Sequence, residues 1–342
     1  MAYSTITKPS LHFNTKLYTG NGSTQSITGV GFQPDWLWIK DRGSTYYHYL
    51  QDAVRTSDNV MFSNGTDAAQ NYPNAIQSFD TDGFTTGSQG ATNNNGNNFV
   101  SWNWKAGGGQ GSSNTDGSIN TTYTSVNTTA GFSISQFTGT GSNATVGHGL
   151  GVVPKMYIVK GLVGTRQWAV YHESIGNTKG LTLNSNAAES TETSWWNSTS
   201  PTSSVISVGT SANANDNGNA MIVYAFAEKK GYSKFGRYTG TGNVDGKFLY
   251  LGFKPAFFLI KRLTNESWIL TDNKRGYPHQ WNYILPDTSG VEGGAVPYDF
   301  LSNGVKFRGT TQNESGSEYV YMAFAAEPLV ANVGQSIPAT AG

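Results

Sequence analysis

The sequence predicts an all-β protein: three tandem antiparallel β-sandwich repeats, jelly-roll-like in character, with a short arm at each end. Three observations predict this class. One set of motifs recurs three times in the same order along the 342 residues. Apolar residues alternate with a period of two between Gly- and Asn-rich turns roughly every 8 to 12 residues, which is typical of sandwiches and jelly rolls. No segment of about a dozen residues keeps the 3.6-residue period of an amphipathic helix.

The recurring motifs mark where each repeat opens and closes. A Tyr/Phe-Thr-Gly-x-Gly motif opens each repeat, starting at Tyr18, Phe137 and Tyr238. A proline-led apolar run follows, and its prolines (Pro34, Pro154 and Pro255) lie 120 and 101 residues apart. Each run ends in a lysine, and these are Lys40, Lys160 and Lys261. An aromatic-rich segment closes each repeat, at 99–106, 221–228 and 319–327. Because the order is the same three times, we interpret the chain as three repeats.

The motifs and the composition between them set the expected boundaries. We predict an N-terminal arm over 1–16, repeats over 17–107, 132–230 and 235–328, a linker over 108–131 and a C-terminal tail over 329–342. In the linker, 18 of 24 residues are Gly, Ser, Thr or Asn, a composition that predicts a flexible spacer. The connection between repeats two and three is short, so these two should be held more rigidly.

The proline-led run of the first repeat is apolar on both faces. Trp36 and Trp38 share one face, and Leu37 and Ile39 share the other, which predicts a strand between two packed layers. We expect Trp36, Tyr157 and Phe257 to be buried at equivalent places.

Two charged pairs recur between repeats. Asp52 with Arg55, and Asp272 with Arg275, have a spacing that favours a buried ion pair, whereas the second repeat carries His172 at that place.

Charge and composition exclude several classes. Lys plus Arg and Asp plus Glu each number 22, so the net charge is zero, and only 13% of residues are charged. Phosphate binding needs a surplus of basic residues, so no nucleic-acid partner is expected. Cysteine is absent, which excludes disulfides and thiolate nucleophiles. The N-terminus lacks the features of a signal peptide and no apolar run is long enough to span a membrane, so we expect synthesis in a host cytoplasm without membrane insertion.

Catalytic and metal-binding motifs are not found. The five histidines have no metal-ligand spacing, the glycine-rich motifs lack the ending of a phosphate loop, and there is no GxSxG elbow. We therefore expect no enzyme activity, no catalytic residue, no metal and no cofactor. A carboxylate pair for glycoside hydrolysis stays open, because such partners can lie far apart in the chain. The candidates are Glu173, Glu189, Glu192 and Asp272.

Four aromatic residues are the candidate binding residues. Trp195 and Trp196 lie in polar, loop-like sequence, as do Tyr277 and Trp281. Aromatic rings beside Asn and Ser suit stacking on a sugar or packing at a protein interface, and the alternative is that they cap the core.

Residues 10–42 resemble an uncharacterised repeat family of virion structural proteins in tailed bacteriophages, abundant in marine ones. The similarity continues through 79–84, 99–107 and the C-terminal 322–341, and it is weaker in the second repeat, which lacks the Asp35–Trp36 pair. The resemblance implies a virion protein on the particle surface, as a tail fibre, appendage or capsid decoration, acting by adhesion or assembly. The alternative is a glycan-degrading enzyme or an array of carbohydrate-binding modules on a jelly-roll scaffold.

The two arms predict assembly. They carry apolar residues without an assigned partner in the repeats: Ile6, Leu11, Phe13, Leu329, Val330, Val333 and Ile337. Such arms gain most by lying along another subunit, where they can extend a sheet edge. We expect a homo-oligomer, with three subunits, that binds other virion proteins and a host-surface glycan.

Overall fold

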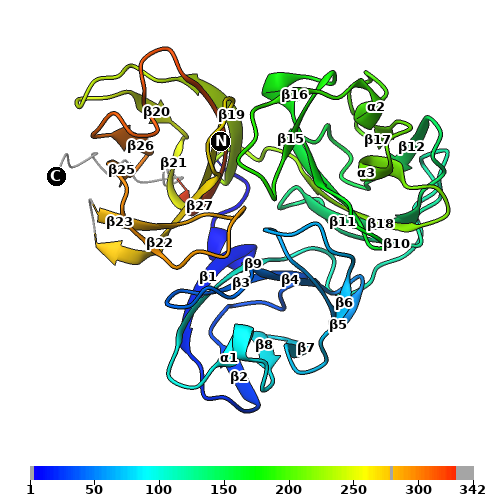
Figure 1. Ribbon diagram of the computed structural model, residues 1–342, viewed down its shortest axis with the longest axis horizontal. Coiled ribbons are helices and arrows are strands. Elements are labelled where there is room, and N and C mark those ends of the chain that lie inside the picture. Colours follow the sequence, from blue (N-terminus) through cyan, green and yellow to red (C-terminus); the bar gives the residue numbers. More distant parts are fainter. Residues whose placement is uncertain (1–3, 278–279, 329–342) are drawn as a thin grey trace.

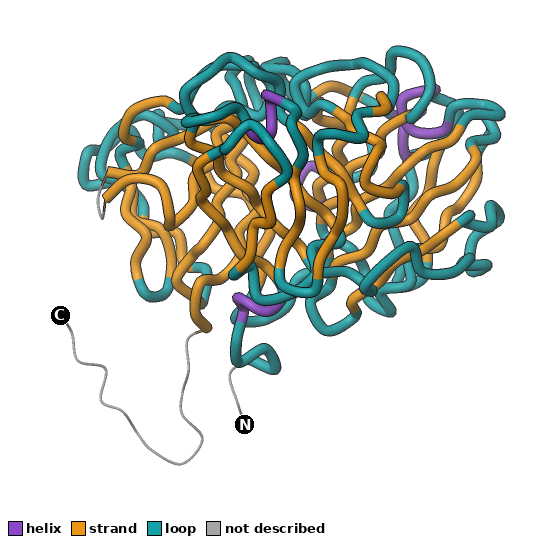
Figure 2. The backbone as a smooth tube through the Cα atoms, turned by 90° about the horizontal axis from the view of Figure 1, so that it is seen from below, coloured by secondary structure: helices purple, strands orange, loops and turns teal. Residues whose placement is uncertain are grey.

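A computed structural model describes residues 4–277 and 280–328 and confirms the all-β class. Three lobes surround a common centre (Figure 1). Each lobe is a sandwich of one large and one small sheet, and all the paired strands within these sheets are antiparallel. The helices are short: η1 (Pro9–Leu11), α1 (Gly90–Asn93), η2 (Glu173–Ile175), α2 (Thr193–Trp196) and α3 (Ala212–Asn215). Strands and loops therefore make up almost all of the chain (Figure 2).

Lobe 1 comes from the first third of the chain. Its large sheet has the order β1 (Phe13–Thr19), β9 (Asn98–Trp104), β3 (Trp36–Asp41), β4 (Tyr49–Asp52), β5 (Thr56–Met61), β6 (Gln70–Asn71). Its small sheet has the order β2 (Gln25–Thr28), β8 (Gly83–Thr86), β7 (Ile76–Asp80).

Lobe 2 has one additional edge strand. Its large sheet has the order β10 (Tyr123–Asn127), β11 (Phe132–Thr138), β18 (Ala220–Phe226), β13 (Met156–Gly161), β14 (Trp168–His172), β15 (Lys179–Thr182), β16 (Ser190–Thr191). Its small sheet pairs β12 (Ala144–Gly147) with β17 (Val205–Val208).

Lobe 3 follows directly. Its large sheet has the order β19 (Ser233–Thr239), β27 (Glu318–Pro328), β21 (Phe253–Arg262), β22 (Ile269–Tyr277), β23 (Gln280–Ile284), β24 (Gly293–Ala295). Its small sheet has the order β20 (Phe248–Tyr250), β26 (Gly304–Phe307), β25 (Tyr298–Leu301). Apart from β10, the three large sheets share one order: the opening strand, the closing strand, the proline-led strand and then the next three strands of the chain.

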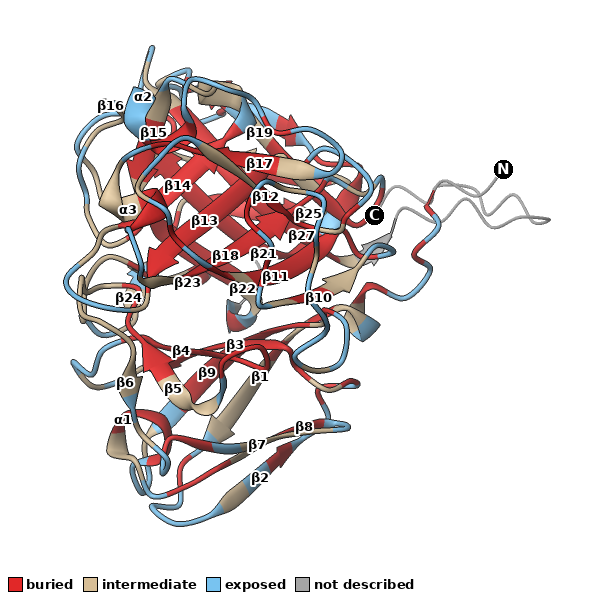
Figure 3. Cartoon of the chain, turned by 90° about the vertical axis from the view of Figure 1, so that its right-hand side faces the viewer, coloured by how far each residue is buried: buried red, intermediate tan, exposed pale blue. Residues whose placement is uncertain are grey.

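The proline-led strands β3 and β13 are buried on both faces, as their two-sided apolar pattern predicts (Figure 3). In β3, Trp36 and Trp38 belong to the core at the centre of the molecule, whereas Leu37 and Ile39 belong to the core inside the sandwich. The expectation for Tyr157 needs a correction. It is buried, but it belongs to the sandwich core of lobe 2, and Met156 is the residue that faces the centre.

The central core joins all three lobes through aromatic rings. Trp36 of lobe 1 stacks on Tyr224 of lobe 2, with ring centroids 4.5 Å apart. Trp104 of lobe 1 lies 5.3 Å from Phe257 of lobe 3. Phe226 of lobe 2 lies 6.1 Å from Phe324 of lobe 3. Because the burial of such rings dominates the energetics of a core, the lobes stabilise one another and are not independent domains.

One side chain at an equivalent position in each lobe forms a hydrogen bond to the neighbouring lobe, and the three bonds close a ring of contacts. The Trp168 indole of lobe 2 donates to the Phe62 carbonyl of lobe 1 at 2.8 Å. The Trp268 indole of lobe 3 donates to the Thr182 carbonyl of lobe 2 at 2.9 Å. His48 of lobe 1 completes the cycle, because its Nε2 lies 3.1 Å from the Leu285 carbonyl of lobe 3.

The lysines that end the proline-led strands are buried beside these seams. Lys160 donates to the carbonyls of Thr66 and Arg166 at 3.0 and 2.8 Å, and Lys40 and Lys261 donate to backbone carbonyls in the same way. Burial lowers the pKa of Lys40, Lys160 and Lys261 to about 8. All three ammonium groups are therefore mostly charged at neutral pH, with carbonyl oxygens replacing water.

Residues 108–131 differ from the expected flexible linker. They contain β10, which pairs with β11, and Ser112 forms a bridge with Thr124. Gly111 explains how the chain returns so closely: its φ is +76°, and a Cβ there would lie 2.0 Å from the Thr124 carbonyl oxygen. Part of this polar tract is thus an edge strand of lobe 2.

The N-terminal arm packs within its own chain, which corrects the expectation that its apolar residues need another subunit. Ile6 and Phe13 are buried in the central core. Phe13 begins β1 and stacks on Phe324 of lobe 3, with ring centroids 5.3 Å apart. Leu11 is exposed. The tail residues 329–342 lie outside the described residues.

Candidate binding site

The two neighbouring tryptophans proposed for sugar contact are core residues of lobe 2. Trp195 and Trp196 lie in α2, where their side chains are only 4% and 0% exposed. Trp196 packs against Tyr157, with ring centroids 4.9 Å apart, and its indole donates to the Lys179 carbonyl. These two residues therefore cap the sandwich, and the expectation of ligand contact is wrong for them.

The other pair lies in lobe 3. Trp281 in β23 is buried and stacks on Phe300, with ring centroids 5.1 Å apart, so ligand contact is wrong for this residue as well. Tyr277 ends β22, where its backbone pairs with Gln280. The side chain of Tyr277 lies outside the described part of the chain.

Three histidines are buried and act as structural hydrogen-bonding groups. In each, Nδ1 accepts a hydrogen bond and Nε2 faces a carbonyl oxygen: this holds for His48, His148 and His172. Burial lowers the pKa of all three, that of His172 to about 4, so each is neutral at pH 7. Within residues 4–277 and 280–328, no three acidic or histidine side chains group closely enough to hold a metal ion. His279 lies outside the described residues.

The two Asp–Arg pairs form as predicted and also join lobes. Arg55 Nε lies 2.6 Å from Asp52 Oδ2, and the same oxygen accepts the Tyr224 hydroxyl of lobe 2 at 2.6 Å. Arg275 Nε lies 2.6 Å from Asp272 Oδ2, which also accepts the Trp102 indole of lobe 1 at 2.9 Å. Both carboxylates are fully buried, so they serve the seams between lobes and are not open to a substrate.

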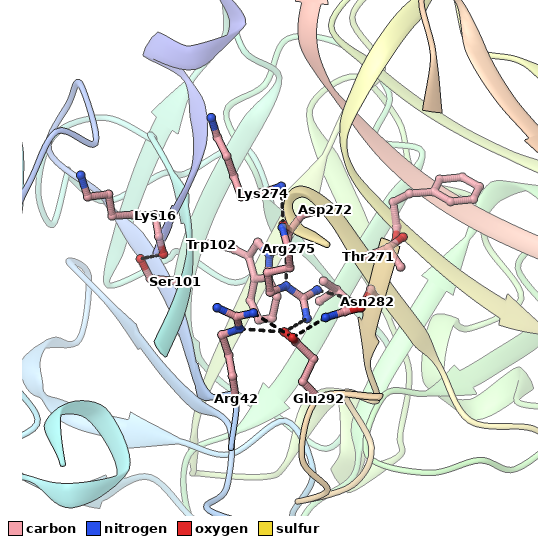
Figure 4. A network of polar contacts seen from close by, with 12 residues as sticks. Lys16, Arg42, Ser101, Trp102, Thr271, Asp272, Lys274, Arg275, Asn282 and Glu292 are labelled. Carbon is pink, nitrogen blue, oxygen red and sulfur yellow. Dashed lines mark hydrogen bonds and ion pairs between the residues drawn. The ribbon is translucent and has the colours of Figure 1, made fainter. Parts of the chain in front are cut away.

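Glu292 extends the second pair across the seam between lobes 3 and 1 (Figure 4). Its carboxylate accepts two hydrogen bonds from Arg42 of lobe 1, each 2.8 Å long, and lies 3.1 Å from Arg275. Asn282 donates a further hydrogen bond at 2.7 Å. Burial alone would raise the pKa of Glu292, but the Arg42 hydrogen bonds and the Arg275 charge outweigh it, so the pKa lies below its ordinary value.

The four candidates for a hydrolytic carboxylate pair have different partners. Asp272 is held in its ion pair, and Glu173 pairs with Lys155 at the surface. Glu192 accepts a hydrogen bond from Ser190 at the edge of lobe 2. Glu189 joins the seam with lobe 3 through its backbone amide, which donates to Leu263.

A cavity of about 330 Å³ in lobe 1 is the strongest binding candidate, and we call it the tyrosine pocket. Its lining consists of Thr45, Tyr46, Tyr47, Tyr49, Phe62, Asp67, Gln70, Tyr72 and Ala91. The floor is buried, whereas Tyr46 and Tyr47 remain 40% and 46% exposed. Aromatic surface exposed beside polar groups in a concave site is typical of a ligand pocket.

Four aromatic rings of the tyrosine pocket pack edge to face. Phe62 lies at the centre, with ring centroids 5.4 Å from Tyr47, 5.1 Å from Tyr49 and 6.3 Å from Tyr72. Gln89 donates a 2.8 Å hydrogen bond to the Tyr49 hydroxyl. The aromatic wall is thus fixed by packing before any ligand arrives.

The chain belongs to the family described as domain of unknown function DUF7483. The family model matches residues 8–328, so one match spans all three lobes and the second half of the N-terminal arm. No curated protein matches the sequence. Among the residues that the structure describes, no helix has the length and apolar character needed to cross a membrane.

Within this DUF7483 chain, the equivalent positions of the other lobes have different chemistry. The residues at the place of Tyr46 and Tyr47 are Arg166 and Gln167 in lobe 2 and Glu266 and Ser267 in lobe 3. Strand register supports this equivalence, because β3, β13 and β21 pair with β4, β14 and β22 in the same way. Arg166 is engaged in an ion pair with Asp216. The exposed tyrosine pair is therefore a feature of lobe 1.

Sequence reasoning missed Tyr46 and Tyr47 because the surrounding segment, 45–50, looks like the start of an aromatic strand. The signal was available: at the equivalent positions, repeats two and three have polar residues. An aromatic residue is expected to be exposed when the equivalent positions in the other two repeats are polar. This comparison between repeats predicts exposure better than the polarity of the neighbouring residues does.

Proposed function

We propose that this protein is a non-catalytic structural component of a tailed-bacteriophage virion, exposed on the particle surface as a tail fibre, appendage or capsid decoration. The resemblance of residues 10–42 to virion repeat proteins supports the location. The observation that carries the structural role is the closed ring of lobes around one aromatic core. In a ring closed in this way, each lobe is held by both neighbours and does not move independently of them.

Composition supports the same role. The net charge is zero and few residues are charged, so little of the stability rests on surface ion pairs that salt would screen. A protein exposed on a particle in salt water needs this tolerance.

The location can be tested on particles. An antibody raised against the recombinant 342-residue chain should label intact virions of the phage that encodes it, in immunogold electron microscopy. Labelling restricted to lysate protein, with clean particles unlabelled, would refute the proposal. Labelling at the tail or at the capsid would separate a fibre from a decoration.

We further propose that the chain assembles as a homo-oligomer, with three subunits as the first expectation, and binds other virion proteins. Because Ile6 and Phe13 are buried inside the chain, we place docking on the tail residues and on edge strands of the large sheets. Sedimentation equilibrium of the full chain measures the subunit number, and a monomer at micromolar concentration would contradict the proposal.

Carbohydrate binding is the second candidate function, and the tyrosine pocket favours it. Its described lining includes one carboxylate, that of Asp67, whereas most glycoside hydrolases use a pair. We therefore propose binding without cleavage. Incubation with bacterial polysaccharide should release no new reducing ends, and steady release by the purified chain would instead favour the glycan-degrading alternative.

A further inference from the structure

We propose that the tyrosine pocket of lobe 1 binds a single neutral sugar ring of a glycan. This inference rests on the proposed adhesive role, and it names the site and the class of ligand. The argument uses the groups that line the pocket, their hydrogen bonds and the comparison between lobes.

The first step concerns the rings. Tyr46 and Tyr47 line the cavity and are 40% and 46% exposed. A tyrosine ring offers an apolar face and a polar tip, which match the C–H face and the hydroxyl rim of a pyranose. Gly90 at the start of α1 lies beside Tyr46: a Cβ there would come 3.1 Å from the Tyr46 hydroxyl oxygen. The glycine thus leaves room for this tyrosine at the rim.

The second step concerns the polar groups. The hydroxyls of Tyr46 and Tyr47 and the carboxylate of Asp67 make no hydrogen bond to any residue that the structure describes. Gln70 accepts from the Tyr72 hydroxyl at 3.0 Å, which leaves its amide group free to donate. Unused donors and acceptors beside an aromatic wall are the groups that fix a sugar by its hydroxyls.

The third step concerns charge and size. Asp67 lies near the charged Lys160, which donates to the Thr66 carbonyl next to it in sequence. The nearby positive charge offsets that of Asp67, which favours a neutral ligand over a cation. A cavity of about 330 Å³ is at the small end of ligand pockets, which suits one sugar unit at the end of a chain or on a branch.

Lobe 3 has a cavity of about 430 Å³ at the equivalent place, and it provides an internal comparison. Its lining includes Glu266 and Ser267 where lobe 1 has tyrosines, and Leu285 where lobe 1 has Phe62. The shape recurs but the stacking surface does not. We therefore assign sugar binding to lobe 1.

The experiment is saturation-transfer difference NMR on the full 342-residue chain. The probes are the methyl glycosides of glucose, galactose, mannose and N-acetylglucosamine, with tetramethylammonium as a cationic probe of the same aromatic wall. At least one sugar should bind with a dissociation constant on the order of 1 mM, and tetramethylammonium should bind more weakly.

Variants locate the site. Tyr47→Ala should weaken binding at least tenfold, and Asp67→Asn, which keeps the side-chain shape, should weaken it about fivefold. Tyr46→Leu retains most of the packing and removes the hydroxyl and the ring, so it keeps the test valid if Tyr47→Ala fails to fold. Tyr250→Ala, at a tyrosine of lobe 3 that is 48% exposed, is the matched control and should leave binding unchanged.

Three results would overturn the assignment: no signal from any of the four sugars, sugar binding unaffected by the folded pocket variants, or tetramethylammonium binding more tightly than every sugar. None of these depends on where the protein resides. If sugars bind as expected but virions are not labelled by the antibody, the virion proposal fails and the sugar site stands. If virions are labelled and sugars do not bind, the reverse holds.

Discussion

Lobes 2 and 3 bind their neighbouring lobes by different chemistry at equivalent positions of their large sheets. At β22 of lobe 3, the buried Asp272–Arg275 pair reaches lobe 1 through the Trp102 indole. At β14 of lobe 2, the neutral His172 reaches lobe 3, with Nε2 3.2 Å from the Tyr321 carbonyl. The topology is the same in both, so the seam requires a satisfied hydrogen bond at this place and not a particular charge.

The largest expected effect on stability comes from removing the aspartate of a buried Asp–Arg pair. Asp52→Ala should lower the free energy of unfolding by about 3–5 kcal/mol, because it leaves Arg55 buried without a carboxylate. Asp272→Ala should cost less, because Arg275 keeps Glu292 at 3.1 Å. Urea unfolding of the two variants measures the difference. An equal or reversed order would contradict the role assigned to Glu292.

The next effect separates the histidine seam from the ion-pair seams by pH. The pKa of His172 is about 4 in the folded chain, below its ordinary value of 6.5. Its contribution to stability is therefore present above pH 6.5 and is lost as the pH falls through about 4. We expect the loss to reach on the order of 3 kcal/mol by pH 4.

His172→Gln tests this assignment, since glutamine can donate to the same carbonyl without titrating. The variant should show a shallower decline in urea midpoint between pH 6.5 and 4. If its decline equals that of the parent chain, acid sensitivity arises elsewhere, for example at Glu292, whose lowered pKa places its loss of stability below about pH 4.5.

A smaller effect is expected from removing one of the three buried lysines, and it appears on the alkaline side. The pKa of Lys160 is about 8 when folded and about 10.5 when unfolded, so stability is present above pH 10.5 and is lost as the pH falls through 8. The unfolding free energy should therefore rise between pH 8 and 10. Lys160→Met should reduce this rise by about one third, because Lys40 and Lys261 share the behaviour. An unchanged rise would exclude Lys160 as a contributor.

The smallest effect concerns the two connections between lobes. Residues 107–118 are largely exposed, so limited proteolysis should still cut there before it cuts in 228–237. Because the three lobes share one core, the nicked chain should stay together in size-exclusion chromatography and separate only in denaturant. Release of a folded fragment of lobes 2 and 3 under native conditions would show that lobe 1 is less firmly held than its contacts indicate.

The sequence was sufficient for the β class, for the order of motifs and for the Asp–Arg pairs, because each depends on residues close together in the chain. It could not identify what covers the second face of β3, because Trp36 packs against Tyr224, which lies far along the chain in another lobe. The same limit applies to the candidate binding residues. Trp195 and Trp196 lie in polar sequence and are buried by the fold of lobe 2, whereas Tyr47 lies beside aromatic residues and is exposed.

The fusion of three similar lobes into one chain has a consequence for valency. In a ring of three identical subunits, one gene specifies every copy, so a tyrosine pair gained by one subunit is gained by all three. Here the copies are encoded separately, and one lobe can specialise for contact while the other two keep their seams. Under the proposed function, a single chain would offer one sugar site, and strong attachment to a cell surface would come from the number of chains on each particle.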